Sequence, residues 1–177
     1  VMLDRVAALP LPGILCAAGI GAVFGAIAWF DPAITGGGES IVQRVFDGGI
    51  ALWPMLAILA VRWLLGPLAY AAGTPGGLFA PLLAIGALAG AIVASAANLV
   101  APALAFDPTL AAIAGMAAFF TAVVRAPLTG IALVLGMTGT VTPMLPVIAA
   151  SLAATIVPAL LGSAPIYDTL RERMRRS

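Results

Sequence analysis

The sequence predicts an all-α, polytopic membrane protein whose helices are partly broken or re-entrant. Hydrophobic residues make up 63% of its 177 positions and charged residues only 8%, whereas a soluble domain carries about 25% charged residues. Residues 63–106 and residues 126–167 contain no charged side chain. Each stretch is about twice the roughly 20 residues that one membrane-spanning helix needs. So few charges cannot cover a water-facing surface, and we expect the chain to lie in a lipid bilayer.

The N-terminal third predicts two spans with a polar connection between them. Residues 11–30 are the first span, and residues 31–49 form the connection, with a short helix over residues 39–46. Residues 52–72 are the second span and carry Arg62 near their middle. Small residues let helices approach closely in lipid. We therefore expect close helix packing at three glycines of the first span: Gly19, Gly21 and Gly25.

Residues 73–81, GTPGGLFAP, place a cluster of glycine and proline within the uncharged stretch of residues 63–106. Such a cluster interrupts a helix. Inside a membrane, irregular backbone is tolerated only where it is buried in protein or lines a cavity. Helical character resumes over residues 79–100. Interrupted apolar segments of this kind are typical of transporter sites built from broken helices.

The remaining sequence predicts three more apolar helices and a basic tail. The helices cover residues 109–124, 126–137 and 143–161, and the tail covers residues 166–177. We expect residues 1–165 to form one transmembrane unit and residues 166–177 to form a final helix with a cytoplasmic tail. By the positive-inside rule, the basic residues of the tail place the C-terminus in the cytoplasm. These residues are Arg171, Arg173, Arg175 and Arg176. The expected location is the cell (inner) membrane.

The glycine and proline cluster can bind an anion without a charged side chain. If a helix begins near Phe79, its first amides have no intrahelical acceptor, and the positive end of the helix dipole points at the same place. The amides of Leu78 and Phe79 are then the chloride donors. Gly76 and Gly77 let the backbone approach an ion closely, and Pro81 suits a first helical turn. The alternative is a simple turn between helices.

Four other residues carry candidate roles, each with a plainer alternative. Tyr167 can donate a phenolic hydrogen bond to an anion, or it is an interfacial belt tyrosine. Arg62 and Arg125 are either functional charges in apolar segments, or they reach to headgroups or cap a helix C-terminus. Glu39 is either a proton carrier or a solvent-exposed loop acid.

Several function classes are disfavoured by what the sequence lacks. It contains no histidine and one cysteine, Cys16, so an internal disulfide is excluded and the usual soft metal ligands are missing. The net charge is +1, so the chain has no strong positive electrostatic potential that would attract a nucleic acid. The sequence shows no nucleophile–base pair and no paired carboxylates, so we expect neither an enzyme nor a cofactor.

Four segments resemble the CLC family of chloride channels and chloride/proton antiporters. GGLFAP (residues 76–81) resembles the G-x-F-x-P signature of that family, and residues 112–139 resemble the stretch that follows it. PIYDTLRERM (residues 165–174) resembles the final helix of the family, and ITGGGES (residues 34–40) resembles an upstream loop. The first three of these segments, in order and with matching spacing, form a strong signal for the C-terminal half of this inverted-repeat fold.

The resemblance implies a homodimer in which each subunit has its own chloride pathway. In the family, chloride is held by amides equivalent to those of Leu78 and Phe79 and by a tyrosine hydroxyl, here that of Tyr167. The partners implied are chloride, the lipid bilayer and an N-terminal half of the same transporter. The family's dimer interface involves the helices that correspond to residues 127–137 and 143–161. On these helices we expect the contact residues Leu128, Ile131, Leu135, Val147, Ile148, Leu152 and Ile156.

The resemblance leaves the transport mode open. The gating and proton-transfer glutamates of the family belong to its N-terminal half, so a channel and an antiporter are both compatible with these residues. Gly136 stands where many relatives carry an acid, which affects a local role on that helix and not a chloride ligand. A non-transporting membrane scaffold and a different broken-helix anion transporter are the competing hypotheses.

Overall fold

A computed structural model describes residues 13–71, 77 and 79–161. Within these ranges the regular structure is helical and contains no strand, which confirms the all-α prediction for them. In chain order the elements are α2 (Gly13–Phe30), α3 (Pro32–Thr35), α4 (Glu39–Phe46), α5 (Leu52–Ala71), α6 (Phe79–Val100), η1 (Pro102–Leu104), α7 (Pro108–Val124), α8 (Pro127–Thr138) and α9 (Met144–Leu160). Each helix expected within these ranges is present, with ends that differ by at most one residue. The expected final helix, over residues 166–177, lies outside the described residues.

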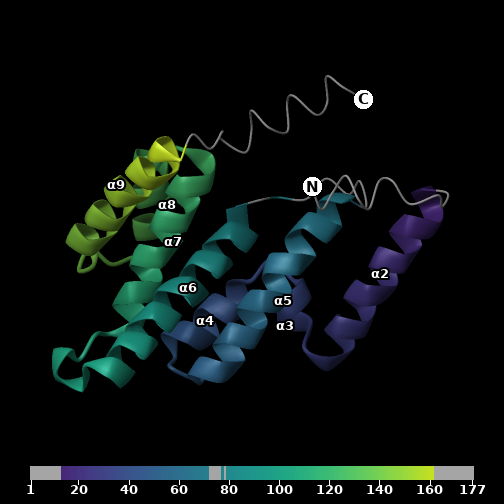
Figure 1. The fold of residues 1–177 in the computed structure, drawn as a ribbon, viewed down its shortest axis with the longest axis horizontal. Helices are drawn as coiled ribbons and strands as arrows, with labels where there is room; N and C mark the ends of the chain where they lie inside the picture. Colours follow the sequence, from purple (N-terminus) through teal and green to yellow (C-terminus); the bar gives the residue numbers. More distant parts are fainter. Residues whose placement is uncertain (1–12, 72–76, 78, 162–177) are drawn as a thin grey trace.

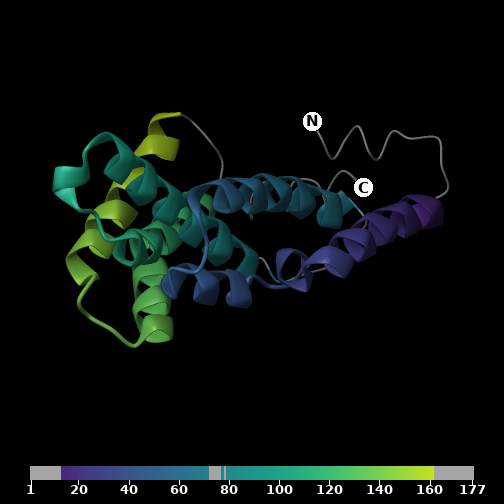
Figure 2. The ribbon, with the colours of Figure 1, turned by 90° about the horizontal axis from the view of Figure 1, so that it is seen from below.

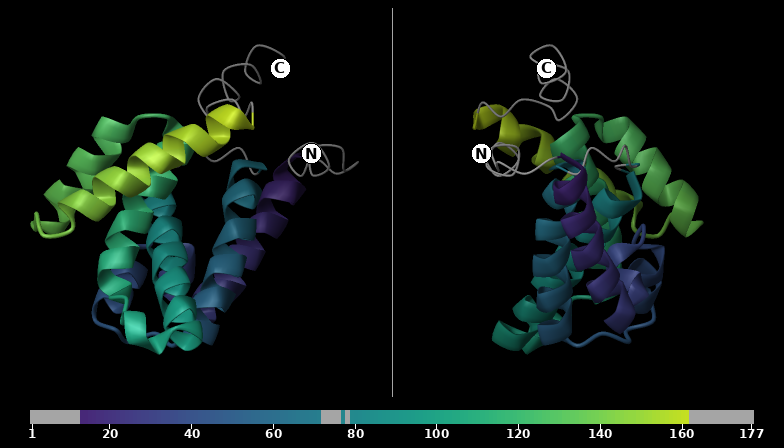
Figure 3. Two further views of the ribbon diagram at one scale, coloured as in Figure 1. Left: turned by 60° about the vertical axis from the view of Figure 1, so that its left-hand side comes forward. Right: turned by 90° about the vertical axis from the view of Figure 1, so that its right-hand side faces the viewer.

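The helices form a packed body with an extension on one side (Figure 1). Helices α4 and α6 to α9 make up the body, and α5 lies between α6 and α2 (Figure 3, left). Figure 2 shows α8 and α9 at the opposite end of the molecule from α2. The C-terminal ends of α2 and α6 and the N-terminal ends of α5 and α7 lie at the same edge, which is the lower edge of Figure 1.

Two of the described helices are long and apolar enough to cross a membrane. They are α5, over Leu52–Ala69, and α6, over Phe79–Val100. The 22 residues of α6 correspond to a length of about 33 Å, and a bilayer core is about 30 Å thick. The 12 residues of α8 extend only about 18 Å, which agrees with the expected re-entrant segment.

Proline and capping residues set the ends of the shorter helices. Asp107 caps α7 by accepting a hydrogen bond from the Thr109 amide at 2.8 Å, and Pro108 takes the first helical position, where its missing N–H costs nothing. Helix α7 ends at Val124, followed by the C-cap residue Arg125 with a φ of 63°, and Ala126 is disfavoured in the α-helical conformation because it precedes Pro127. Gly139, also with φ of 63°, ends α8.

The closest helix packing is between α6 and α7, and it uses glycines. A Cβ on Gly86 would lie 2.5 Å from the carbonyl oxygen of Gly115, and a Cβ on Gly90 would collide with the Ala111 carbonyl. Small residues thus bring two backbones together, as expected in lipid. The prediction that the α2 glycines do this was wrong for the described residues, because no described atom lies within 4 Å of a Cβ placed on any of them.

The buried core lies where α4, α6, α7, α8 and α9 meet. Its largest fully buried apolar side chains are Phe120, Ile41, Leu88, Met116, Val134 and Val147. The burial of Val147 corrects the expected dimer face, because this side chain packs inside its own subunit and cannot meet a partner. Leu152 and Ile156 on the same helix are exposed, as that face requires.

Candidate anion site

Helix α6 begins at Phe79, as the sequence predicts. Gly77 before it is exposed and outside regular structure, and Pro81 lies in the first turn. The first four amides of any α-helix lack an intrahelical acceptor, and the proline has no N–H to leave unbonded. The start of α6 therefore has the local form that an anion site at a helix N-terminus needs. Gly76, Leu78 and Tyr167 lie outside the described residues, so their roles at this site stay predictions.

The aromatic ring of Phe79 anchors the start of α6 on α7. It stacks on Phe120, with ring centroids 5.5 Å apart and an interplanar angle of 26°. Phe120 is fully buried, whereas Phe79 is 46% exposed. One face of the Phe79 ring thus rests on the core, and the residue that carries the proposed donor amide is held in place by packing.

Arg62 is buried and hydrogen-bonds backbone carbonyl groups of its own chain. It is 5% exposed, and its guanidinium donates four hydrogen bonds of 2.9 to 3.2 Å to carbonyl oxygens around the end of α3. The acceptors are the carbonyls of Ala33, Ile34, Gly36 and Gly37. Of the alternatives for Arg62, this geometry favours the capping of a helix C-terminus. The guanidinium group donates to several carbonyl oxygens at the end of α3 that lack an intrahelical donor.

Arg125 connects α7 to α9. Its backbone N–H donates to the Thr121 carbonyl and closes α7, while its Nη1 donates to the Thr155 carbonyl of α9 at 3.3 Å. The side chain is partly buried. The Arg125 side chain thus links two helices, and because Thr155 lies five residues before the end of α9, the alternatives of a functional charge and a helix cap stay predictions.

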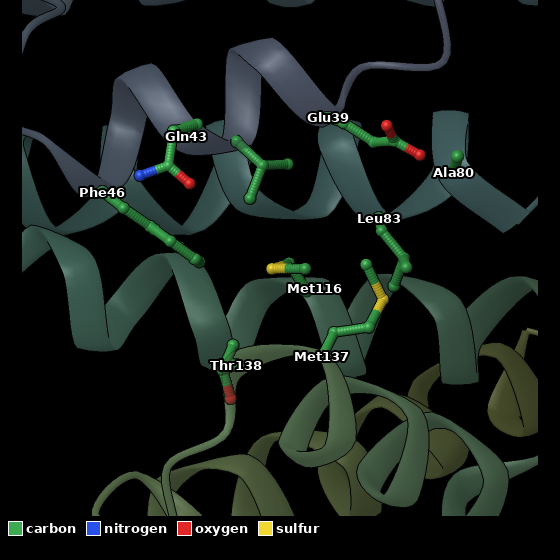
Figure 4. A pocket seen from close by; sticks show the side chains of 9 residues that line it. Glu39, Gln43, Phe46, Ala80, Leu83, Met116, Met137 and Thr138 are labelled. Atoms are coloured by element: carbon green, nitrogen blue, oxygen red, sulfur yellow. The ribbon is translucent and has the colours of Figure 1, made fainter.

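Glu39 lines a pocket between α4, α6, α7 and α8 (Figure 4). The cavity has a volume of about 180 Å³, and its wall is mostly apolar, with Leu83, Met116 and Met137 among its residues. Glu39 and Gln43 come from α4, and Thr138 comes from the end of α8. The Glu39 side chain is exposed, so the structure favours the plainer alternative of a solvent-exposed acid.

An ion pair between Asp31 and Arg44 was not expected from the sequence. Arg44 Nη1 donates to Asp31 Oδ2 at 2.7 Å, and Nη2 donates to Oδ1 at 3.2 Å. These hydrogen bonds lower the pKa of Asp31 against a smaller opposing effect of burial, and they raise the pKa of Arg44. Asp31 also caps α3 by accepting from the Ala33 amide at 3.0 Å. The amphipathic pattern of α4, with Arg44 on its polar side, was the only sequence signal for this pair.

Comparison with known proteins gives one consistent result. Residues 2–159 match the family model described as "Voltage gated chloride channel". The H(+)/Cl(-) exchange transporter ClcA of Vibrio campbellii is 41% identical over 154 residues, which are 87% of this chain and 33% of that protein. The ClcA of Salmonella typhimurium is 38% identical over 160 residues, or 90% of this chain and 34% of that protein. The chain thus spans about a third of the length of these relatives.

A solved structure shows the same likeness in three dimensions. It is described as that of a slow cyanobacterial Cl-/H+ antiporter, and it superposes with a TM-score of 0.71 at 30% sequence identity. The match covers 92% of this chain and 43% of the antiporter chain.

Proposed function

This chain belongs to the voltage gated chloride channel family, and we propose that it is the C-terminal half of a chloride transporter. The single observation that carries the proposal is the start of α6 at Phe79, directly after the glycine and proline cluster. We place chloride at this helix start, held by the amides of Leu78 and Phe79 and by the Tyr167 hydroxyl. Gly76, Gly77 and Pro81 shape the loop around it. Chloride is the transported substrate, with no cofactor and no catalytic step.

The proposed transport mode is exchange of chloride for protons. The relatives from Vibrio and Salmonella are H(+)/Cl(-) exchange transporters, and the similar solved structure is that of a Cl-/H+ antiporter. A passive chloride channel is the second candidate, supported by the description of the matching family as a chloride channel. An N-terminal half of the same transporter supplies the groups on the far side of the ion, because an anion out of water needs donors on all sides.

The proposed assembly is a homodimer in the cell (inner) membrane with the C-terminus in the cytoplasm. Support for the dimer comes from the exposed apolar side chains on α8 and α9, which include Leu128, Leu145, Leu152, Ile156 and Leu160. Lipid is the alternative neighbour of this face, because an apolar surface can contact either lipid or a second copy of the chain. The orientation rests on the arginines near the C-terminus and on the positive-inside rule.

Flux through liposomes tests the proposal. The transporter that contains this chain is reconstituted in vesicles with a chloride gradient, and chloride and proton movements are recorded together. Exchange predicts chloride efflux with stoichiometric proton uptake, and a channel predicts chloride efflux alone. Tyr167→Ala and the isolated 177-residue chain are the comparison samples, and both should show much reduced chloride flux. Absence of chloride flux in the intact transporter would refute the function.

A further inference from the structure

We propose that Arg62 and the glycine loop (residues 36–38) are a positioning device for the start of α6. The inference rests on the proposed anion site there, and it adds the residues that hold that site in shape. Arg62 is a positioning residue in this scheme, since its hydrogen bonds go to backbone carbonyls and not to an ion.

The guanidinium fixes the path of the loop. Nη1 donates to the carbonyls of Ala33 and Ile34, and Nη2 donates to those of Gly36 and Gly37. Two nitrogens in one rigid plane hold four acceptors in fixed relative positions, which the single ammonium of lysine cannot do. Arg62 is 5% exposed; its hydrogen bond to the Ala33 carbonyl is buried, and the other three are partly buried.

The glycine loop in turn lies against the first turns of α6. A Cβ on Gly37 would touch the Ala80 Cβ at 3.6 Å. A Cβ on Gly38 would overlap the Cβ of Ala84 and lie 2.8 Å from Arg62 Nη2. Gly38 also has a φ of 104°, a conformation that L side chains rarely adopt. The loop is therefore packed between the guanidinium and α6, with no room for a side chain at residue 38.

Phe79 also holds the start of α6 in place, through its contact with α7. Its ring stacks on Phe120 of α7 at 5.5 Å, while its neighbour Ala80 meets the glycine loop. A site made of backbone amides has no side-chain rotamer to adapt to an ion, so its geometry depends on where the helix starts. Binding groups must be held to within about 0.5 Å for full effect. A small shift of α6 away from the loop should therefore weaken chloride binding.

The experiment adds one methyl group at two glycines in the intact transporter. Gly38→Ala inserts a Cβ against Ala84 and Arg62, whereas Gly48→Ala inserts one at a φ of 67° with nothing within 4 Å. Gly48→Ala is the matched control because it carries left-handed strain without crowding. Chloride affinity is measured by calorimetry, and hydrogen exchange of the peptide that covers residues 77–85 reports the start of α6 directly.

We expect Gly38→Ala to weaken chloride affinity about tenfold and to speed exchange in this peptide by a similar factor. Gly48→Ala should leave both readouts within about twofold of the unmodified transporter. Ala84→Gly added to Gly38→Ala removes the Cβ overlap with α6 and should restore part of both losses, since the added Cβ still lies 2.8 Å from Arg62 Nη2. If Gly38→Ala does not fold, Arg62→Lys provides the second variant, with faster exchange and weaker binding expected.

The outcomes separate this inference from the proposed function. Faster hydrogen exchange in Gly38→Ala that Ala84→Gly relieves supports the positioning device, whether or not chloride binds. Absence of chloride binding in the unmodified transporter would refute the proposed anion site and leave the positioning device standing. Normal exchange and affinity in a folded Gly38→Ala or Arg62→Lys protein would overturn the inference while chloride binding stands. A loss that Ala84→Gly does not relieve at all would overturn it as well, because packing of the loop on α6 would then contribute nothing to the loss.

Discussion

Gly86 on α6 and Gly115 on α7 lie face to face, so that a Cβ on Gly86 would stand 2.5 Å from the Gly115 carbonyl oxygen. The contact is reciprocal, because a Cβ on Gly115 would collide with the Gly86 carbonyl. The two helices that flank the candidate anion site thus touch through their backbones. Stability of the α6–α7 pair should depend on the absence of side chains at both positions.

Gly86→Ala tests this dependence with a single methyl group. The added Cβ must push the helices apart, and we expect a loss of about 1–3 kcal/mol in the free energy of unfolding. Gly136→Ala on α8 is the control, since no described atom lies within 4 Å of its Cβ position. That variant should gain up to about 1 kcal/mol from a less flexible unfolded chain. Unfolding in detergent micelles measures both, and equal stability of the two variants would contradict the packing.

The Asp31–Arg44 pair predicts a loss of stability in acid. Its hydrogen bonds hold the pKa of Asp31 below the ordinary value of 3.8. A carboxyl with a lowered folded-state pKa contributes stability that is present above 3.8 and is lost as the pH falls through the folded-state value. Because the side chains are 26% and 48% exposed, the effect should be small.

Asp31→Asn isolates the ion pair from the cap. Asparagine still accepts a hydrogen bond at a helix N-terminus, so α3 keeps its cap, while the side chain loses its charge and one of the two oxygens that accept from Arg44. Between about pH 5 and pH 3, the melting temperature should fall further in the unmodified protein than in Asp31→Asn. Parallel melting curves over that range would show that the pair contributes nothing to folding.

Two buried hydroxyls on facing helices should be dispensable. Thr121 Oγ1 on α7 and Ser151 Oγ on α9 are fully buried and have no hydrogen-bond partner among the described residues. An unpaired buried polar group costs about 1–3 kcal/mol. Thr121→Val and Ser151→Ala should therefore raise the thermal stability, each by roughly 1 kcal/mol. Thr155→Val is the control and should lower it, since Thr155 Oγ1 donates to the Ser151 carbonyl at 3.0 Å.

Helix boundaries were readable from the sequence because glycine and proline interrupt helices wherever they cluster. The short helix α4 (Glu39–Phe46) and the start of α6 at Phe79 both fall where the pattern places them. The Pro127 break after Arg125 is likewise marked by a local signal. These features depend only on neighbouring residues, so one sequence is enough to find them.

The sequence pattern did not predict which face of each helix is buried. Helices α2, α7 and α9 are apolar on all sides, so no periodic pattern distinguishes Val147, which is buried, from Leu152, which is exposed. The glycines of α2 and α6 look alike in sequence, yet only those of α6 meet a neighbouring backbone in the described structure. The acceptors of Arg62 lie 25 to 29 residues away. Contacts of this kind depend on the tertiary arrangement.

The proposed dimer leads to the last prediction. Leu152 and Ile156 are 54% and 58% exposed on α9, and helices in lipid associate by close packing of matching shapes. In a C₂ dimer each such residue lies on a patch that meets its own copy. A tryptophan at either position adds bulk that this self-complementary surface cannot accommodate.

Leu152→Trp and Ile156→Trp should therefore convert the transporter from dimer to monomer in detergent. Leu99→Trp is the matched control, because Leu99 is 73% exposed but lies on α6, away from α8 and α9. It should stay dimeric. Chloride affinity should be unchanged in all three variants, since each proposed pathway lies within one subunit. Mass measurement by light scattering, with chemical cross-linking, gives the oligomeric state. Dimers that persist in both α9 variants would show that this face contacts lipid, and loss of chloride binding along with the dimer would place part of the ion site at the interface.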